Sequence, residues 1–289
     1  MTNFLIMIIS KNITINGAES KLIAIDIFLP DNSEKCPVVV YAHGFCGFKD
    51  WGNFDLIAKM FVESGMAFIK FNFSHNGTTP EFPQDFVDLE AFGNNNYSKE
   101  LTDLRAVIDW ITKKDNQYLK RTSHEKLYLI GHSMGGGMSI LHSAEDSRIK
   151  KLATWAAIAA CKTPWGNWDT ERLELWKKMG VQFYTNGRTK QDLPLYYQLY
   201  EDYLQHEDEY NIPNKIATLT IPVLICQGTK DTAVTMDSAL LLHKSLPNST
   251  LFTIESDHVF GRSHPWLTEE LPVATVALVA ETIKFFCKD

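Results

Sequence analysis

The pentapeptide Gly131-His132-Ser133-Met134-Gly135 constrains the fold of this chain more than any other feature. It lies between an apolar run at 127–130 and a segment with helical periodicity at 138–144. A G-x-S-x-G pattern in that setting predicts a sharp strand-to-helix turn that exposes the serine hydroxyl. The glycines fit this prediction because a Cβ atom in so tight a turn would clash. We therefore expect Ser133 at the tip of a strand-turn-helix unit.

Short apolar runs without polar alternation recur along the chain, as is typical of strands buried on both faces of a parallel sheet. They occupy residues 38–42, 67–73, 127–130, 153–160, 223–227 and 251–254. Segments with helical periodicity lie between them, at 54–64, 98–112, 138–144, 236–245 and 269–286. This alternation predicts a doubly wound, mostly parallel α/β sheet in a three-layer αβα arrangement.

Two segments depart from the alternation of strands and helices. Residues 11–30 alternate polar and apolar side chains around Asn16-Gly17, which predicts an N-terminal antiparallel hairpin. The apolar residues 4–9 lack the basic flank of a signal peptide and are expected to form a first strand. Residues 162–216 are rich in aromatic and charged residues, and the segment is too long for a plain loop. It is predicted to form a small helical cap. The cap is an insertion in a single domain that spans residues 1–289.

Composition narrows the classes of partner. A net charge of −7 without a Lys/Arg-rich run disfavours a nucleic-acid or anionic-membrane partner. The five cysteines are scattered and form no C-x-x-C pair, so neither a disulfide framework nor a zinc site is indicated. We expect a cytoplasmic monomer or homodimer that binds a small molecule. The chain also lacks the H-E-x-x-H, P-loop and dinucleotide-binding patterns, so no metal or cofactor is expected.

A serine hydroxyl becomes a strong nucleophile only beside a base, which in turn needs an acid to orient it. Asp231 follows the strand predicted at 223–227, and His258 follows the strand predicted at 251–254. Open α/β sheets carry their functional groups at the carboxyl ends of the strands. We therefore predict Ser133 as nucleophile, His258 as base and Asp231 as the orienting acid.

Other residues compete for two of these roles. Asp237 is a less suitable acid because it falls within a predicted helix, and Asp257 adjoins His258 too closely in sequence to reach its Nδ1 atom. His264 is the more serious alternative to His258 as the base.

An oxyanion hole needs two N–H donors directed at the carbonyl under attack. The backbone N–H of Met134 is one candidate because it opens the helix that follows the serine. The backbone N–H of Phe45 is the other, in the loop that begins His43-Gly44 directly after a predicted central strand. Cys46 is interpreted as a bystander in this loop rather than as a reactive thiol.

The predicted cap supplies aromatic residues that either line a substrate pocket or pack the cap onto the core; those named for the pocket are Trp165, Trp168, Tyr184 and Tyr200. Its acidic residues are more typical of a solvated helix face than of a site for a substrate amine; they are Glu201, Asp202, Glu207, Asp208 and Glu209.

The residues His43-Gly44, Gly131 to Gly136, Gly228-x-x-Asp231 and His258 together resemble the α/β-hydrolase superfamily. Within it the chain is most similar to intracellular carboxylesterases of the cinnamoyl-esterase and serine-aminopeptidase-like branch. The resemblance implies hydrolysis of small acyl or aryl carboxylic esters through an acyl-serine intermediate. A serine peptidase and an acyltransferase on the same three residues remain alternatives, as does a non-catalytic binding protein.

Overall fold

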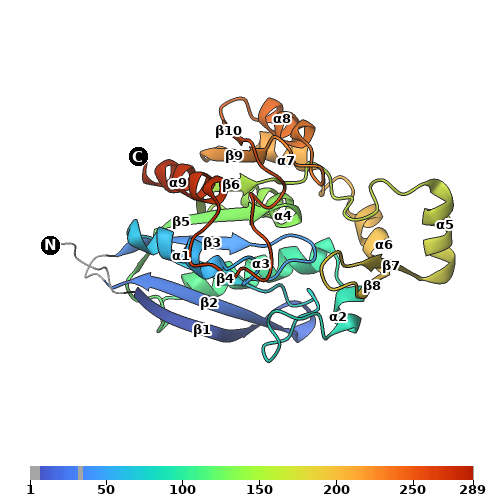
Figure 1. Ribbon diagram of the computed structural model, residues 1–289, viewed down its shortest axis with the longest axis horizontal. Coiled ribbons are helices and arrows are strands. Elements are labelled where there is room, and N and C mark those ends of the chain that lie inside the picture. The colour runs from blue at the N-terminus through green and yellow to red at the C-terminus, as the bar shows by residue number, and fades with distance from the viewer. Residues whose placement is uncertain (1–6, 32–34, 289) are drawn as a thin grey trace.

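An eight-stranded sheet forms the centre of the protein in a computed structural model that describes residues 7–31 and 35–288 (Figure 1). The strand order is β1-β2-β4-β3-β5-β6-β9-β10. The strands are β1 (Met7–Asn16), β2 (Leu22–Pro30), β3 (Cys36–Ala42), β4 (Ala67–Phe71), β5 (Thr122–His132), β6 (Ile149–Trp155), β9 (Val223–Gly228) and β10 (Thr250–Ile254). Pairing is parallel from β4 through β10, whereas β1 and β2 pair antiparallel. The predicted mostly parallel sheet is confirmed.

The central strands have continuous apolar sequences because both of their faces are covered. In β3, Val38 and Val40 pack into one hydrophobic core, whereas Val39 and Tyr41 pack into the other. Successive side chains of a strand point to opposite faces, so a run of valines serves both cores. This explains why these strands lack the polar alternation of a half-exposed sheet.

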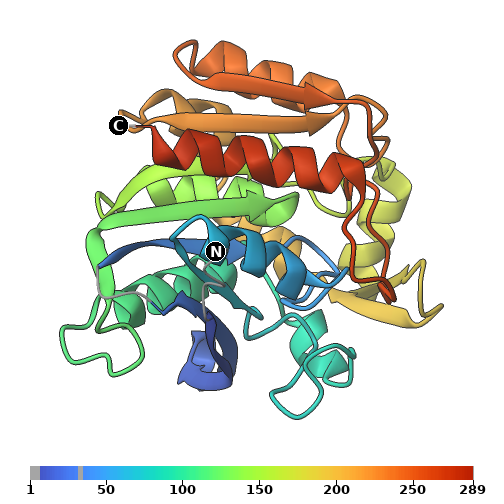
Figure 2. The same ribbon diagram turned by 60° about the vertical axis from the view of Figure 1, so that its left-hand side comes forward.

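Helices cover both faces of the sheet and complete the predicted three layers. On one face lie α1 (Phe54–Glu63) and α9 (Val273–Cys287), which Figure 2 shows in front of the strands. On the other face lie α3 (Tyr97–Thr112), α4 (Met134–Ser143) and α8 (Met236–Ser245). Among the described residues, no helix has the length and apolar character needed to cross a bilayer.

The predicted N-terminal hairpin is present as β1 and β2, with Asn16 opposite Leu22. Its connection is longer than the two-residue turn that Asn16-Gly17 suggests, and it contains the short helix η1 (Ala18–Ser20). The Ala18 N–H donates to the Asp103 carboxylate at 2.7 Å, which ties the connection to α3. The strand expected at 4–9 is seen from Met7 onward; residues 4–6 lie outside the described residues.

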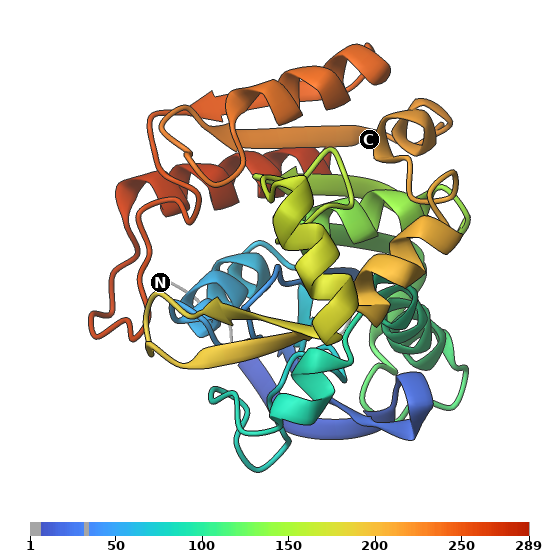
Figure 3. The same ribbon diagram turned by 90° about the vertical axis from the view of Figure 1, so that its right-hand side faces the viewer.

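The segment 162–216 contains helices, as predicted, and also an antiparallel hairpin that was not predicted. The helices are α5 (Thr170–Met179), α6 (Gln198–Gln205) and α7 (Ile212–Ala217), the last of which packs against α4 and α8. The hairpin consists of β7 (Val181–Thr185) and β8 (Asp192–Tyr196) (Figure 3). Leu193 and Leu195 of β8 are buried in the core that lies beneath α3 and α4, so the hairpin is anchored to the main domain. A further short helix, α2 (Leu89–Gly93), contacts β8.

Candidate active site

Ser133 occupies the predicted sharp turn between β5 and α4. Its backbone lies at φ 55° and ψ −122°, a conformation that L-residues rarely adopt and that costs backbone energy. The flanking glycines allow close packing around it. A Cβ atom on Gly131 would lie 2.3 Å from the Gly135 carbonyl oxygen, and a Cβ atom on Gly135 would lie 2.2 Å from the His43 carbonyl oxygen. Glycine is therefore required at both positions.

Asp231 and His258 come from the carboxyl ends of β9 and β10 and form a hydrogen-bonded pair. The His258 Nδ1 atom lies 2.7 Å from Asp231 Oδ2. The other carboxylate oxygen, Oδ1, accepts from the backbone N–H groups of Ala233 and Val234, each at 2.9 Å. Burial raises the pKa of Asp231, but the hydrogen bonds from His258 and these amides outweigh it and hold that pKa below its usual value. The carboxylate is therefore ionised and oriented toward the imidazole.

Two neighbours support this pair: Gln227, which was not predicted, and Gly228, which belongs to the Gly228-x-x-Asp231 pattern of the sequence. The Gln227 side-chain N–H donates to Asp231 Oδ2 at 2.9 Å and to the Val234 carbonyl at 2.7 Å, which fixes the carboxylate relative to its own loop. Gly228 allows the end of β9 to approach the loop after β10, because a Cβ atom there would lie 2.4 Å from the Ser256 carbonyl oxygen. The sequence gives no signal for Gln227, whose role depends on the fold of the loop.

The competing candidates have other partners. His264 Nδ1 accepts from the Gly52 N–H at 3.2 Å, and the imidazole packs against Phe48 and Trp51. Asp257 accepts from the backbone N–H groups of Val259 and Gly261 in its own turn. Asp237 lies in the first turn of α8. Of the three aspartates considered, Asp231 is thus the one that pairs with His258.

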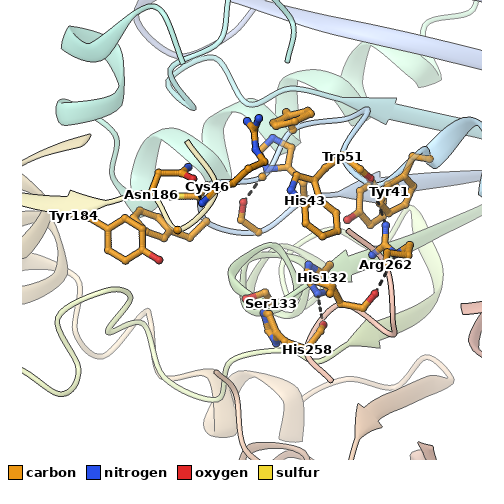
Figure 4. Close-up of a pocket in the computed structure, with 18 residues that line it drawn as sticks. Tyr41, His43, Cys46, Trp51, His132, Ser133, Tyr184, Asn186, His258 and Arg262 are labelled. Atoms are coloured by element: carbon orange, nitrogen blue, oxygen red, sulfur yellow. Dashed lines mark hydrogen bonds between the residues drawn. The ribbon is translucent and has the colours of Figure 1, made fainter. Parts of the chain in front are cut away.

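Ser133 and His258 line the same cavity, which has a volume of about 200 Å³ (Figure 4). Aromatic side chains make much of its wall apolar, and two arginines and three histidines are among its polar groups. With Ser133 and His258, its lining includes Tyr41, His43, Phe45, Cys46, Phe48, Trp51, His132, Tyr184, Asn186, Arg188 and Arg262. The cavity therefore has room for a small substrate beside the serine hydroxyl.

The loop that carries Phe45 lies directly against the serine. A Cβ atom on Gly44 would be 2.7 Å from the Ser133 Cβ atom, so only glycine allows this approach. His43 holds the loop: its Nδ1 donates to the Gly44 carbonyl at 2.9 Å, and its Nε2 accepts from the Phe73 N–H at 3.3 Å. Burial lowers the pKa of His43 to about 4, so the imidazole is neutral at physiological pH.

The start of α4 also faces this region. Met134 is the first residue of the helix, so its backbone N–H has no acceptor within the helix. Cys46 follows Phe45 with a φ of 54°, and burial raises the pKa of its thiol. A protonated thiol is a weak nucleophile, in keeping with the bystander interpretation.

A buried ion-pair network anchors Lys49 and Asp50, at the end of the loop that carries Phe45. The Lys49 ammonium contacts Asp26 at 2.7 Å and Asp50 at 2.7 Å. The Lys70 ammonium contacts Asp55 at 2.5 Å and also pairs with Asp50. Among the described residues, the three aspartates are the one acidic group with metal-ligand spacing, and the two lysine ammonium groups lie within it.

Of the four aromatic residues named for a substrate pocket, only Tyr184 lines the cavity that contains Ser133. Trp165, Trp168 and Tyr200 instead surround Trp176, with ring centroids 5.9, 5.1 and 6.0 Å from it. This correction has a packing reason: the cap is small, and its aromatic residues supply its hydrophobic core.

Among the acidic residues of the cap, Asp202 has a largely covered side chain, with 8% of it exposed. It accepts from the Tyr210 hydroxyl at 3.1 Å and from the Ser98 backbone N–H at 3.2 Å, which ties α6 to α3. Its carboxylate therefore links the cap to the main domain.

Further residues at the cavity had not been predicted. His132 had a signal in the sequence, because it lies within the pentapeptide itself. Arg262 and Asn186 had no such signal. Arg262 belongs to the loop after β10 and Asn186 to the turn of the β7–β8 hairpin, and only the tertiary structure brings them to the cavity of Ser133.

Solved structures share this architecture. Est1E from Butyrivibrio proteoclasticus, in a structure with bound ferulic acid, aligns with a TM-score of 0.70 at 22% identity, over 95% of this chain and 97% of that chain. The esterase domain of a Rhodothermus marinus protein aligns with a TM-score of 0.61 at 17% identity, over 96% of this chain and 99% of that domain. At these identities the similarity concerns the fold.

Comparison of sequences identifies a family. An uncharacterized 31.7 kDa Escherichia coli protein, from the traX-finO intergenic region, is 28% identical over 140 residues, which is 48% of this chain. The match spans 44% of the length of that relative, less than half. A family model described as the alpha/beta hydrolase fold matches residues 37–211, which include the Phe45 loop and Ser133. Because this match covers more than half of the chain, the protein belongs to the α/β-hydrolase fold family.

Proposed function

We propose that this protein is a serine hydrolase that cleaves small carboxylic esters. The observation that carries the proposal is the arrangement of Ser133 on a strained turn in the same cavity as His258, whose Nδ1 lies 2.7 Å from Asp231. Esterases among the structural neighbours support a hydrolase of this kind.

In the proposed reaction, the Ser133 Oγ attacks the ester carbonyl while His258 accepts the serine proton. The new C–O bond gives a tetrahedral oxyanion, which the backbone N–H groups of Phe45 and Met134 stabilise. Collapse of this intermediate breaks the bond to the alcohol, which leaves with the proton from His258. Water then attacks the acyl-serine in the same way, and the acid is released with Ser133 regenerated.

Asp231 supports both steps. Its ionised carboxylate accepts from His258 Nδ1–H, so that Nε2 is the nitrogen available to take a proton. It also stabilises the positive charge that His258 acquires. The backbone amide donors of Ala233 and Val234 keep the carboxylate in one orientation through the cycle.

The proposal is tested by replacing the nucleophile. Ser133→Ala should lower kcat on p-nitrophenyl acetate by a factor on the order of 10⁴–10⁶, because the covalent route is removed. Ser147→Ala, at an exposed position, is the matched control and should retain wild-type turnover. A fluorophosphonate should add its mass to the wild type and not to Ser133→Ala. Wild-type turnover by Ser133→Ala would refute the proposal.

The alternative functions that use the same three residues can be distinguished by their substrates and products. A peptidase would cleave aminoacyl anilides at rates comparable to simple esters, and an acyltransferase would transfer the acyl group to an added alcohol in preference to water. We expect esters to be hydrolysed faster than anilides, with the free acid as the main product.

A further inference from the structure

The charged residues that line the cavity are all positive, although the whole chain has a net charge of −7. They are two arginines, Arg262 and Arg188, and none of the described residues that line it is an aspartate or a glutamate. Cavities lined by one sign of charge concentrate ligands of the opposite sign. The lining of this cavity therefore favours an anionic substrate.

Arg262 is the more informative of the two because it is buried, with 4% of its surface exposed. Its Nε donates to the Val259 carbonyl at 3.1 Å, and its Nη1 donates to the Trp51 carbonyl at 3.4 Å. The guanidinium also stacks over the rings of Phe54 and Trp51, at 4.6 and 5.4 Å from their centroids. All of these partners are uncharged, and a guanidinium has more N–H donors than two carbonyls accept.

No carboxylate forms a salt bridge with Arg262 in the part of the chain that the structure describes. Asp257 acts on it only through a Coulombic interaction, and this exposed carboxylate already accepts from the backbone of its own turn. The buried lysines, in contrast, have carboxylate partners: Lys49 and Lys70, at 1% and 0% exposure, each contact aspartates. A buried cation without an anion is destabilising, so Arg262 stands out as a buried cation whose partners include no carboxylate.

Figure 4 shows the Arg262 side chain beside Tyr41, at the end of the cavity away from Tyr184 and Asn186. Tyr41 is almost fully buried and lines the same cavity, and the neighbouring Arg262 charge acts to lower the pKa of its hydroxyl, although burial raises that pKa overall. A guanidinium binds a carboxylate through two parallel hydrogen bonds, and a neighbouring hydroxyl can donate a third. We propose that the ester substrate carries a carboxylate group, which binds to Arg262 and Tyr41 while the ester carbonyl lies at Ser133. This inference rests on the proposed esterase function and specifies its substrate class.

Arg188 has a different role in this scheme. It lies on the exposed turn of the β7–β8 hairpin, at the border of the cavity, with its guanidinium 5.8 Å from the Phe48 ring centroid. An exposed charge attracts an approaching anion over a distance of about 10 Å and is screened by salt. Arg188 should therefore influence the rate of capture, whereas Arg262 should determine the affinity for the carboxylate.

The test uses two pairs of esters in which one member carries a carboxylate and the other its neutral methyl ester, and it follows cleavage of the acetyl or nitrophenyl ester bond that both members share. One pair carries the carboxylate on the alcohol: 4-acetoxybenzoate and its methyl ester. The other carries it on the acyl group: mono-4-nitrophenyl adipate and its methyl ester. In at least one pair, the wild type should favour the anionic member by about tenfold or more in kcat/KM, since hydrogen bonds between charged groups are stronger than neutral ones. A wild-type preference for the neutral member of both pairs would overturn the proposal without recourse to any variant.

Variants then assign the preference to Arg262. In Arg262→Gln the ratio of kcat/KM for the anionic ester to kcat/KM for the neutral ester should fall to about one. Arg262→Lys should retain part of the preference for the anionic ester. Arg105→Gln, which removes an exposed arginine outside the cavity lining, should keep the full ratio. If Arg262→Gln is folded and keeps the wild-type ratio, Arg262 is a structural link between Val259 and Trp51, and the proposal is wrong.

One further measurement separates this inference from the esterase proposal. Binding of benzoate and of benzamide to the wild-type protein is followed by calorimetry. If no ester is hydrolysed but benzoate binds and benzamide does not, the proposed function fails while the carboxylate site stands. If esters are hydrolysed and the two ligands bind equally weakly, the carboxylate site fails while the esterase function stands.

Discussion

The His132 side chain donates from Nε2 to the backbone carbonyl of His258, with the two atoms 2.9 Å apart. A carbonyl oxygen only accepts, so this bond places the proton of His132 on Nε2. Burial lowers the pKa of His132 well below its usual value, and the neighbouring His258 adds to that effect, so the ring stays neutral. The residue before the nucleophile therefore holds the loop that carries the proposed base.

Loss of this bond should reduce turnover. We expect His132→Phe to lower kcat by about five- to tenfold with little change in KM, because one hydrogen bond contributes about 1 kcal/mol and His258 loses its restraint. His132→Gln, which keeps a side-chain N–H donor, should recover part of the loss. His124→Phe, away from the cavity lining, is the control. Steady-state kinetics on p-nitrophenyl acetate distinguishes these results, and an unchanged kcat in His132→Phe would contradict the role given to His132.

The Phe45 loop lies so close to Ser133 that we expect no residue larger than glycine to be tolerated at Gly44. Gly44→Ala would place a Cβ atom 2.7 Å from the Ser133 Cβ atom and displace the predicted oxyanion donor. The expected loss in kcat is on the order of 10²–10³, as for removal of one such donor. Gly187→Ala is a matched control at the same cavity, since a Cβ atom there meets no other atom within 4 Å. Equal activities of the two variants would show that the Phe45 loop is not part of the reaction.

Substitution of each aspartate by asparagine tests whether Asp231 or Asp257 is the functional acid. Asp231→Asn should lower kcat by about 10⁴, because an amide in place of the carboxylate favours the wrong tautomer of His258. Asp257→Asn retains an acceptor for the Val259 and Gly261 N–H groups and should keep activity within about threefold of the wild type, as expected for an exposed substitution. The opposite order of effects, measured as kcat on one ester, would make Asp257 the functional acid.

Stability should depend on pH through a buried carboxyl group outside the proposed catalytic residues. Burial raises the pKa of Glu100 to about 8, and the charge of Asp103 adds to this, although Asn95 donates a hydrogen bond to it. Because this pKa is higher in the folded than in the unfolded chain, the stabilisation from bound protons is complete below about pH 4.3 and is lost as pH rises toward 8.

The variant Glu100→Gln should remove this contribution. Its free energy of unfolding should exceed that of the wild type at pH 9, by a few kcal/mol at roughly 1.4 kcal/mol per pKa unit, and the two should converge near pH 5. Urea unfolding at pH 5, 7 and 9 measures the difference. Glu81→Gln, at an exposed position, is the control and should follow the wild type. Parallel pH profiles of Glu100→Gln and the wild type would exclude the assignment.

Local patterns in the sequence determined the fold class and the order of the proposed catalytic residues. The apolar runs of β3 and β5 indicate strands buried on both faces, and the glycines around Ser133 indicate a tight turn, because both effects act between residues that are close along the chain. Asp231 and His258 could be proposed because each follows a strand, and the carboxyl ends of parallel strands meet at one edge of the sheet.

Only the tertiary structure decided which side chains meet. The hydrogen bonds from Gln227 to Asp231 and from His132 to the His258 carbonyl depend on loop conformations that no periodicity encodes. The same holds for the cavity: its Arg262 comes from a loop far from Ser133 in sequence, and three predicted cap aromatics pack around Trp176 instead. Contacts between distant segments depend on how whole elements pack, so the turn that holds Ser133 could be read from the sequence, whereas its surroundings could not.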